Sequence, residues 1–282
     1  MNRLNSPLEK DRYLTSDVGV DVIIPMKGQP PLEFHNNLKF HYAEIPIRRL
    51  LIGNCEINDS YWLLSRPYPR MTVLDQRCYR SLGYCIAELI ECVSSEWFVY
   101  LHADVRVVGG WYDVMWAHSS LAEFMECGRV WHDLRTGAKT VAAAQNAAAR
   151  PYSGSQLARR SAFAPFLHKI EDDGYLYRNE DLVFRALVEN HGGRYARVLK
   201  THHEHQVFPS SARDADWYRK MYTGQIKGIV KYCPPKQDWL ISAAAAAFRS
   251  LEGLDAEACQ KLLNWISRTS PAWRDILGSK PN

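Results

Sequence analysis

The sequence predicts an α/β fold, with a mostly parallel central sheet flanked by helices and followed by a C-terminal helical extension. Short β-branched runs alternate with segments of helical length over the first two thirds of the chain, as in βαβ units. Residues of the hydrophobic class make up 46% of the 282 residues, which supplies a core and excludes a disordered or fibrous chain. From Asp214 onward the pattern is helical only. We therefore expect a flexible lead over 1–17, an α/β domain over 18–206 and a helical extension over 207–282.

Four apolar runs predict the first strands. The run Val20–Pro25 is rich in β-branched residues and stops at a proline, as expected for a buried strand that opens into a loop. An amphipathic segment from Leu32 to about Tyr42 predicts a helix. The other strands are expected at Leu50–Ile52, Met71–Leu74 and Trp97–Leu101.

A helix is expected between the third and fourth strands, from about Gln76 to Val93. Cys78, Cys85 and Cys92 repeat along it at heptad spacing, a stripe typical of a buried helix face rather than of a metal site. Because ligands of such sheets bind beyond the carboxyl ends of the strands, chemistry is expected after Pro25, Ile52 and Leu101.

The second half of the α/β domain carries weaker signals. They predict a helix near Trp111–His118, a strand near Lys139–Ala144, a helix over about Asp181–Asn190 and a last strand over Arg194–Leu199. The sequence His191-Gly192-Gly193 is a plausible C-cap. In the extension, one helix face is expected at Leu240, Ala244, Phe248 and Leu251, and helix starts at Asp255 and Ser270-Pro271. We expect these helices to pack against the α/β domain, and the alternative is that they contact a membrane surface or a partner.

Charge and cysteine content limit the expected binding partners and the expected cellular compartment. Lys and Arg total 35 against 31 Asp and Glu, and no concentrated basic run accompanies this small excess, so nucleic acid is not an expected partner. The seven cysteines form no CxxC pair, which favours a reducing compartment. No signal-peptide pattern or long apolar run is visible, so the expected location is cytoplasmic, with a peripheral membrane association as the variant.

Three segments carry candidate chemistry. Asp104 comes shortly after the fourth strand, where a carboxylate can hold a divalent ion that bridges a diphosphate, although an acid there is equally often a turn former. Glu180 and Asp181 begin a predicted helix. They suit either the positive end of its dipole or a general base whose pKa is raised by like charge and burial. His203 and His205 share one side of an extended segment just after the last predicted strand, as metal ligands or as part of a polar turn.

Taken in order, these segments resemble the inverting glycosyltransferases of family 2, which have the GT-A fold. The resemblance covers about residues 20 to 206 and includes the strand Val22–Pro25, the segment Tyr100–Val105 at the place of a DxD motif, Gly154–Phe163, and Asn179–Leu187 closed by Gly192. It implies transfer of a sugar from a UDP- or GDP-linked donor to a hydroxyl of a glycan, lipid-linked or small-molecule acceptor, with Mn²⁺ or Mg²⁺ as cofactor.

The resemblance also assigns roles to residues. Asp181 is the expected general base with Glu180 beside it, and Asp104 is the expected metal ligand, completed by His203 or His205. Donor binding is expected at Pro25, Lys27, Asn54, Arg80 and His102. Two positions depart from the pattern: His102 replaces the first acid of the DxD motif, and Gly53-Asn54 ends the second strand where the family usually has Asp. A histidine there shifts metal preference toward transition ions.

Two other functions stay open on the sequence. A nucleotidyltransferase also uses an acid at a strand end and a metal, but it usually needs a Gly-rich phosphate loop, and only Lys27-Gly28 follows Pro25. A non-catalytic nucleotide-sugar-binding module on a decayed transferase is favoured by the departures at His102 and Gly53.

Overall fold

The computed structural model describes residues 19–27, 33–55, 68–76, 81–141, 154–176, 179–207 and 214–278. Over these residues the strands form one sheet in the order β3-β2-β1-β4-β8-β6-β9-β5, with β7 paired to β6. The strands are β1 (Val20–Lys27), β2 (Ile47–Cys55), β3 (Met71–Asp75), β4 (Trp97–Leu101), β5 (Val105–Val107), β6 (Phe124–Asp133), β7 (Lys139–Val141), β8 (Ser155–Arg159) and β9 (Tyr195–Val207).

The sheet is mixed, so the expectation of a mostly parallel sheet was wrong. Strands β3, β2, β1 and β4 are parallel to one another, as the alternating pattern predicts. In the second half β8 lies antiparallel between β4 and β6, and β5 is antiparallel to β9. The reason is that β5, β6 and β8 carry no strong β-branched run, so the sequence pattern did not reveal them, and antiparallel pairing needs no helical crossover.

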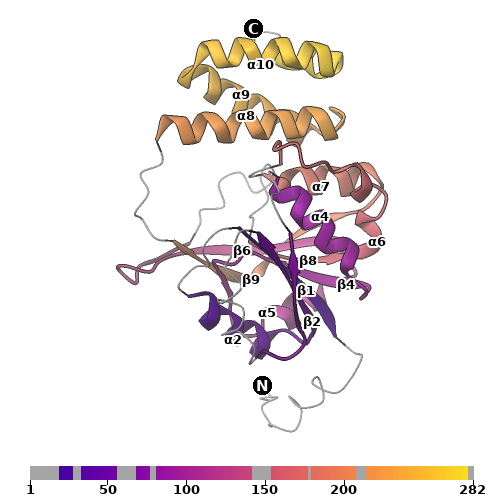
Figure 1. The fold of residues 1–282 in the computed structure, drawn as a ribbon, viewed down its shortest axis with the longest axis vertical. Coiled ribbons are helices and arrows are strands. Elements are labelled where there is room, and N and C mark those ends of the chain that lie inside the picture. The colour runs from indigo at the N-terminus through magenta and orange to yellow at the C-terminus, as the bar shows by residue number, and fades with distance from the viewer. Residues whose placement is uncertain are drawn as a thin grey trace.

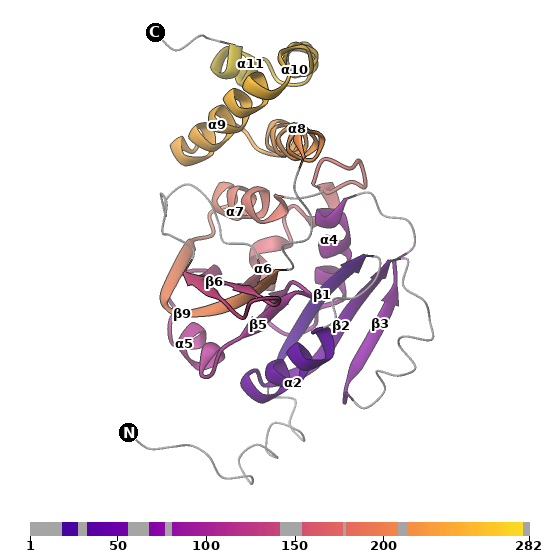
Figure 2. The same ribbon diagram turned by 90° about the vertical axis from the view of Figure 1, so that its left-hand side faces the viewer.

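Helices cover both faces of the sheet. Figure 2 shows α2 (Phe34–Glu44) and α5 (Trp111–Ala117) on one side of it, and α4 (Leu82–Cys92), α6 (Arg160–Phe163) and α7 (Glu180–Asn190) on the other. Each side has its own hydrophobic cluster. A short 3-10 turn, η1 (Leu167–Lys169), follows α6. The cysteine-striped helix begins at Leu82 and not at Gln76. Cys85 is buried on it as expected, but Cys92 is exposed, and Cys78 lies outside the described residues.

The C-terminal helices stack on the α4 and α7 side of the sheet (Figure 1). They are α8 (Ala215–Tyr232), α9 (Asp238–Leu254), α10 (Ala256–Thr269) and α11 (Pro271–Gly278). The cap predicted at Asp255 is confirmed, because its carboxylate accepts from the Ala258 N–H at 2.9 Å, and Pro271 is the first residue of α11 as expected. The predicted face of α9 is buried, with Leu240 and Leu251 fully covered.

The apolar stripes of α9, α10 and α11 therefore pack inward, and they share one hydrophobic cluster with α4 and α7. This packing gives no support to a membrane contact through these helices. No helix within the described residues is long and apolar enough to span a bilayer.

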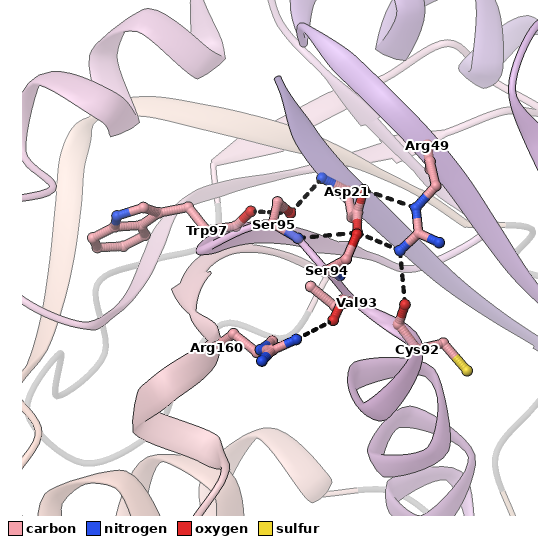
Figure 3. Close-up of polar contacts among 8 residues, drawn as sticks. All are labelled: Asp21, Arg49, Cys92, Val93, Ser94, Ser95, Trp97 and Arg160. Atoms are coloured by element: carbon pink, nitrogen blue, oxygen red, sulfur yellow. Dashed lines mark hydrogen bonds and ion pairs between the residues drawn. The ribbon is translucent and has the colours of Figure 1, made fainter. Parts of the chain in front are cut away.

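A buried ion pair joins three elements at the amino-terminal end of β1 (Figure 3). Asp21 is fully buried, and its carboxylate accepts from Arg49 of β2 at 2.6 Å and from the Ser94 N–H at 2.7 Å. Arg49 also donates to the Cys92 carbonyl at the end of α4. The ion pair therefore ties the first strand to its neighbour and to the connection between α4 and β4.

Candidate functional site

The carboxyl ends of three neighbouring strands bring several predicted donor-binding residues to one edge of the sheet. Pro25 of β1 pairs with Gly53 of β2, the next pair contains Asn54, and His102 directly follows β4, the other neighbour of β1. Lys27 is the last residue of β1, but its side chain lies outside the described atoms. Arg80 also lies outside the described residues.

The departure at Gly53 has a steric explanation. A Cβ atom at this position would lie 2.0 Å from Oε1 of Gln76 and 3.0 Å from Sγ of Cys85. Gln76 follows β3 and also donates to the Cys85 carbonyl at 3.1 Å. A side chain at position 53 would therefore require the end of the Gln76 side chain, which fills this space, to move.

Asp104 and His205 form the central pair of the site. Asp104 follows β4 and His205 lies in β9, more than 100 residues away in sequence, yet Asp104 Oδ2 and His205 Nε2 are 3.1 Å apart. The histidine segment was expected as an extended segment after the last strand or as a polar turn, and it is part of that strand, because β9 continues through Val207. The extended backbone is what brings His205 beside Asp104.

The protonation states of this pair suit metal ligation. Burial opposes the charge of Asp104, but the hydrogen bond and charge of His205 outweigh it and lower the pKa of Asp104 to about 2. Burial lowers the pKa of His205 despite the nearby carboxylate. At neutral pH the pair is therefore an ionised carboxylate that accepts a hydrogen bond from Nε2–H of a neutral imidazole, and a metal bound between them would take the place of that proton.

The spacing of the pair also suits one ion, with further ligands required from elsewhere. The 3.1 Å separation is that of a direct hydrogen bond, and it places one oxygen and one nitrogen ligand on the same side of the site. No group of three or more His, Cys, Asp and Glu side chains in the described part of the chain is arranged to hold a metal. Ions of the Mg²⁺ type commonly take only one or two protein ligands and complete their shell with water and substrate phosphates.

His203 lies in a buried polar cluster. Its side chain is fully buried, with Nδ1 2.8 Å from Ser155 Oγ and 3.4 Å from Cys127 Sγ. Its Nε2 faces Gly154, where a Cβ atom would lie 2.8 Å away. Of the two histidines that the sequence singled out, His205 contacts Asp104 and His203 holds β9 to β8.

The acid pair begins α7, and Glu180 points to the segment that carries Asp104. Its Oε1 accepts from the Tyr100 hydroxyl at 3.1 Å and lies 3.5 Å from Nε2 of His102. Burial opposes its ionisation, but the hydrogen bond and charge of His102 outweigh this and lower the pKa of Glu180. The imidazole of His102 lies with its ring centre 6.1 Å from that of His205, so His102 stands between the acid pair and the Asp104–His205 pair.

Asp181 has a different environment. It is 7% exposed and lines a small cavity whose wall is mostly apolar and includes Phe98, Phe163 and Phe184. Burial, and then the negative charges of Glu180 and Glu126, raise the pKa of Asp181 to about 7. The pKa of Glu180 is thus lowered and that of Asp181 is raised, as expected for an acid pair in which one carboxyl group exchanges a proton near neutral pH.

Sequence reasoning missed two groups near this site. Trp131 of β6 stands opposite His205 in the paired strands, with ring centres 4.9 Å apart, and the Arg129 guanidinium lies 4.9 Å from the centre of the Trp131 ring. Because β6 was not predicted, no signal placed them there. Tyr100 could have been found, since it is two residues before His102 on the same face.

Comparison with known proteins identifies the fold. No protein-family model matches the sequence, and no curated protein sequence matches it. Among the 371 solved chains that match the structure is a crystal structure of GalNAc-T7 with UDP, GalNAc and Mn²⁺, with a TM-score of 0.56 and 10% identity. The match covers 94% of this chain and 57% of the other, so the chain spans a little over half of that neighbour's length. The chain therefore has a GT-A-like glycosyltransferase fold.

Proposed function

We propose that this protein is a glycosyltransferase that takes a sugar from a UDP- or GDP-linked donor with the help of a divalent metal. The observation that carries the proposal is the Asp104–His205 pair at the end of β4, linked through His102 to the acid pair of α7. The GT-A-like fold supports it, as does the neighbour whose crystal structure contains UDP, GalNAc and Mn²⁺.

Asp104 and His205 would hold the metal. When bound, Mn²⁺ or Mg²⁺ supplies positive charge to the diphosphate that departs from the sugar. Pro25, Asn54 and His102 line the same strand ends and would contact the nucleotide part of the donor. The placement of His102 beside Glu180 makes it the connection between the donor side and the acid pair.

Asp181 is the proposed general base of an inverting transfer. Its raised pKa allows it to accept the proton of the acceptor hydroxyl near neutral pH. Glu180, held ionised by His102, would orient Asp181 or the acceptor. Membership of family 2 is part of this proposal and is supported by the order of the motifs from Val22 to Leu187.

Thermal unfolding with a panel of nucleotide-sugars tests the binding part of the proposal. A ligand that binds only the native state raises its stability by an amount set by concentration over Kd. We expect UDP- or GDP-sugars to raise the Tm in the presence of Mn²⁺ and to do so less in EDTA. Equal Tm values with and without every nucleotide-sugar would contradict the proposal.

One observation favours a second function. Glycine stands at position 53, where the Gln76 side chain fills the space that an acid would take, and the described residues hold no ready group of three metal ligands. A nucleotide-sugar-binding module without catalysis also fits these strand ends. Metal-dependent binding of a nucleotide-sugar with no turnover in the presence of any acceptor would favour that module.

A further inference from the structure

We propose that helix α8 is a positioning element of the candidate active site, which fixes the segment 171–176 and through it the place of Glu180 and Asp181. This inference rests on the proposed function for its catalytic consequence. Segment 171–176 precedes α7 by a few residues, and Figure 2 shows α8 lying next to α7 and α4.

Polar contacts from the last turn of α8 hold the start of this segment. The Lys231 ammonium lies 2.6 Å from an Asp173 carboxylate oxygen and 2.7 Å from Glu171. The Tyr232 hydroxyl donates to the same Asp173 oxygen at 2.9 Å and accepts from the Glu171 N–H at 3.2 Å. Lys231 is 25% and Asp173 16% exposed, so this ion pair is shielded more than an ordinary surface pair, whereas Glu171 is 67% exposed.

Glycines of α8 allow close approach to the end of the segment. A Cβ atom at Gly228 would lie 2.8 Å from Cδ2 of Leu176 and 3.2 Å from the Tyr175 carbonyl oxygen. The next nearest atom is Cγ2 of Val183, which lies one turn after Glu180 in α7. Glycine inside a helix costs about 1 kcal/mol relative to alanine, so its presence here indicates a backbone contact that a side chain would prevent.

Helix α4 holds the segment from the other side. The Ser81 N–H donates to the Asp172 carboxylate at 2.8 Å, and the Gly83 N–H donates to the Leu176 carbonyl at 2.9 Å. A Cβ atom at Gly83 would lie 2.6 Å from Cβ of Leu176. The segment is therefore fixed between the start of α4 and α8 just before the chain reaches the acid pair.

The backbone at the start of α7 needs such support. Asn179, the residue before Glu180, has a φ of 155°, which residues other than glycine rarely adopt. A conformation of this kind persists only where the surroundings enforce it, and it is frequent at functional sites. Contacts from α8 to Leu176 and Val183 lie on both sides of Asn179 and can supply that constraint.

Hydrogen–deuterium exchange on the full-length protein tests the structural step. We expect Lys231→Met to increase deuterium uptake in peptides covering 171–176 and the first turn of α7, and to leave those of β1 and β2 unchanged. Lys220→Met is the matched control, because Lys220 lies on the same helix, is 76% exposed and pairs only locally with Asp216 among its described contacts. Uptake in Lys231→Met that equals that of Lys220→Met, or that rises equally over the whole chain, would overturn the proposal.

A pair of glycine variants tests the packing step in the same experiment. Gly228→Ala should increase uptake in the same peptides, whereas Gly253→Ala should not, since a Cβ atom at Gly253 meets nothing within 4 Å among the described atoms. Identical exchange in the two variants would show that the close approach at Gly228 does not fix segment 171–176.

Turnover provides the catalytic readout. With a donor found by the nucleotide-sugar panel, Lys231→Met should lower kcat by roughly tenfold to a hundredfold, as expected for misplaced catalytic groups, with donor KM and UDP–Mn²⁺ affinity within about twofold of wild type. Lys231→Arg should restore most of kcat. A rise in donor KM with unchanged kcat would overturn the positioning role. If the wild-type protein turns over no nucleotide-sugar, the proposed function fails, and the exchange experiment still decides whether α8 fixes the segment.

Discussion

At Asp181 a carboxyl group is held against an apolar wall beside a second acid, and its pKa of about 7 makes the proposed reaction pH-dependent. A general base must be ionised, so we expect kcat to rise with pH through about 7 and to level off above it. Asp181→Asn keeps the shape of the side chain but cannot accept the proton, so kcat should fall by about 10² to 10⁴ and donor KM should hardly change. Glu180→Gln is the comparison variant, and a loss of the pH dependence in that variant alone would transfer the role of base to Glu180.

The same pKa predicts a change in stability that needs no knowledge of the substrate. Because the folded pKa of Asp181 lies above the unfolded value, its contribution to stability is fully present below about pH 4 and is lost as pH rises to about 7. Urea unfolding should therefore show Asp181→Asn gaining stability over wild type between pH 4 and pH 7, by on the order of a few kcal/mol. A difference that stays constant over this range would contradict the raised pKa.

His205 and His203 are expected to behave differently although they are two residues apart. His205→Ala and Asp104→Ala should each remove the Mn²⁺-dependent part of UDP binding, because they would supply the protein ligands. His203→Ala should keep that dependence and instead lower the free energy of unfolding, because it breaks the buried contacts to Ser155 and Cys127. Calorimetry with UDP in Mn²⁺ and in EDTA checks both expectations, and undiminished Mn²⁺-dependent binding by Asp104→Ala would refute the metal assignment.

Among the structural elements, the parallel half of the sheet was the part that could be predicted. Its strands β1 to β4 contain the predicted apolar runs, although β1 continues past Pro25 to Lys27 and β2 continues past Ile52 to Cys55. Strands β5, β6 and β8 were missed because they carry no strong β-branched run, with only three residues in β5, and because their partners are distant in sequence. The contact between Asp104 and His205 depends on those strands, so the sequence named both residues without showing that they meet.

The ion pair of Asp21 and Arg49 joins β1 to β2 and leads to a prediction about stability (Figure 3). Asp21→Asn leaves Arg49 and the N–H groups of Ser94 and Ser95 without their anion, and we expect it to lower the free energy of unfolding by about 2–4 kcal/mol. Because the pair lies at the amino-terminal end of β1, UDP–Mn²⁺ affinity should stay unchanged. Urea unfolding measures the loss of stability, and calorimetry measures the UDP–Mn²⁺ affinity. A loss of affinity without a loss of stability would contradict a purely structural role.

At the scale of the whole molecule, one hydrophobic cluster extends from the sheet through α4 and α7 to α11. The sequence showed the change to helices near residue 207, but a change of pattern does not say whether the second part folds separately. The shared cluster predicts a single cooperative unfolding transition. Trp273 is fully buried in α11 and donates to the Cys233 carbonyl at 2.7 Å, so Trp273→Ala should lower stability by about 3–5 kcal/mol and keep one transition. Two separate transitions in calorimetry would show that the helical extension is an independent domain.

The release of a nucleoside diphosphate from a panel of UDP- and GDP-sugars, measured with Mn²⁺ and again with EDTA, tests the central claim most directly. The proposed mechanism predicts release from at least one donor with Mn²⁺, accelerated by a suitable acceptor, lost in EDTA and lost in Asp104→Ala. Release that continues unchanged in EDTA and in Asp104→Ala, or no release from any donor with any acceptor, would contradict a metal-dependent glycosyltransferase built on Asp104 and His205.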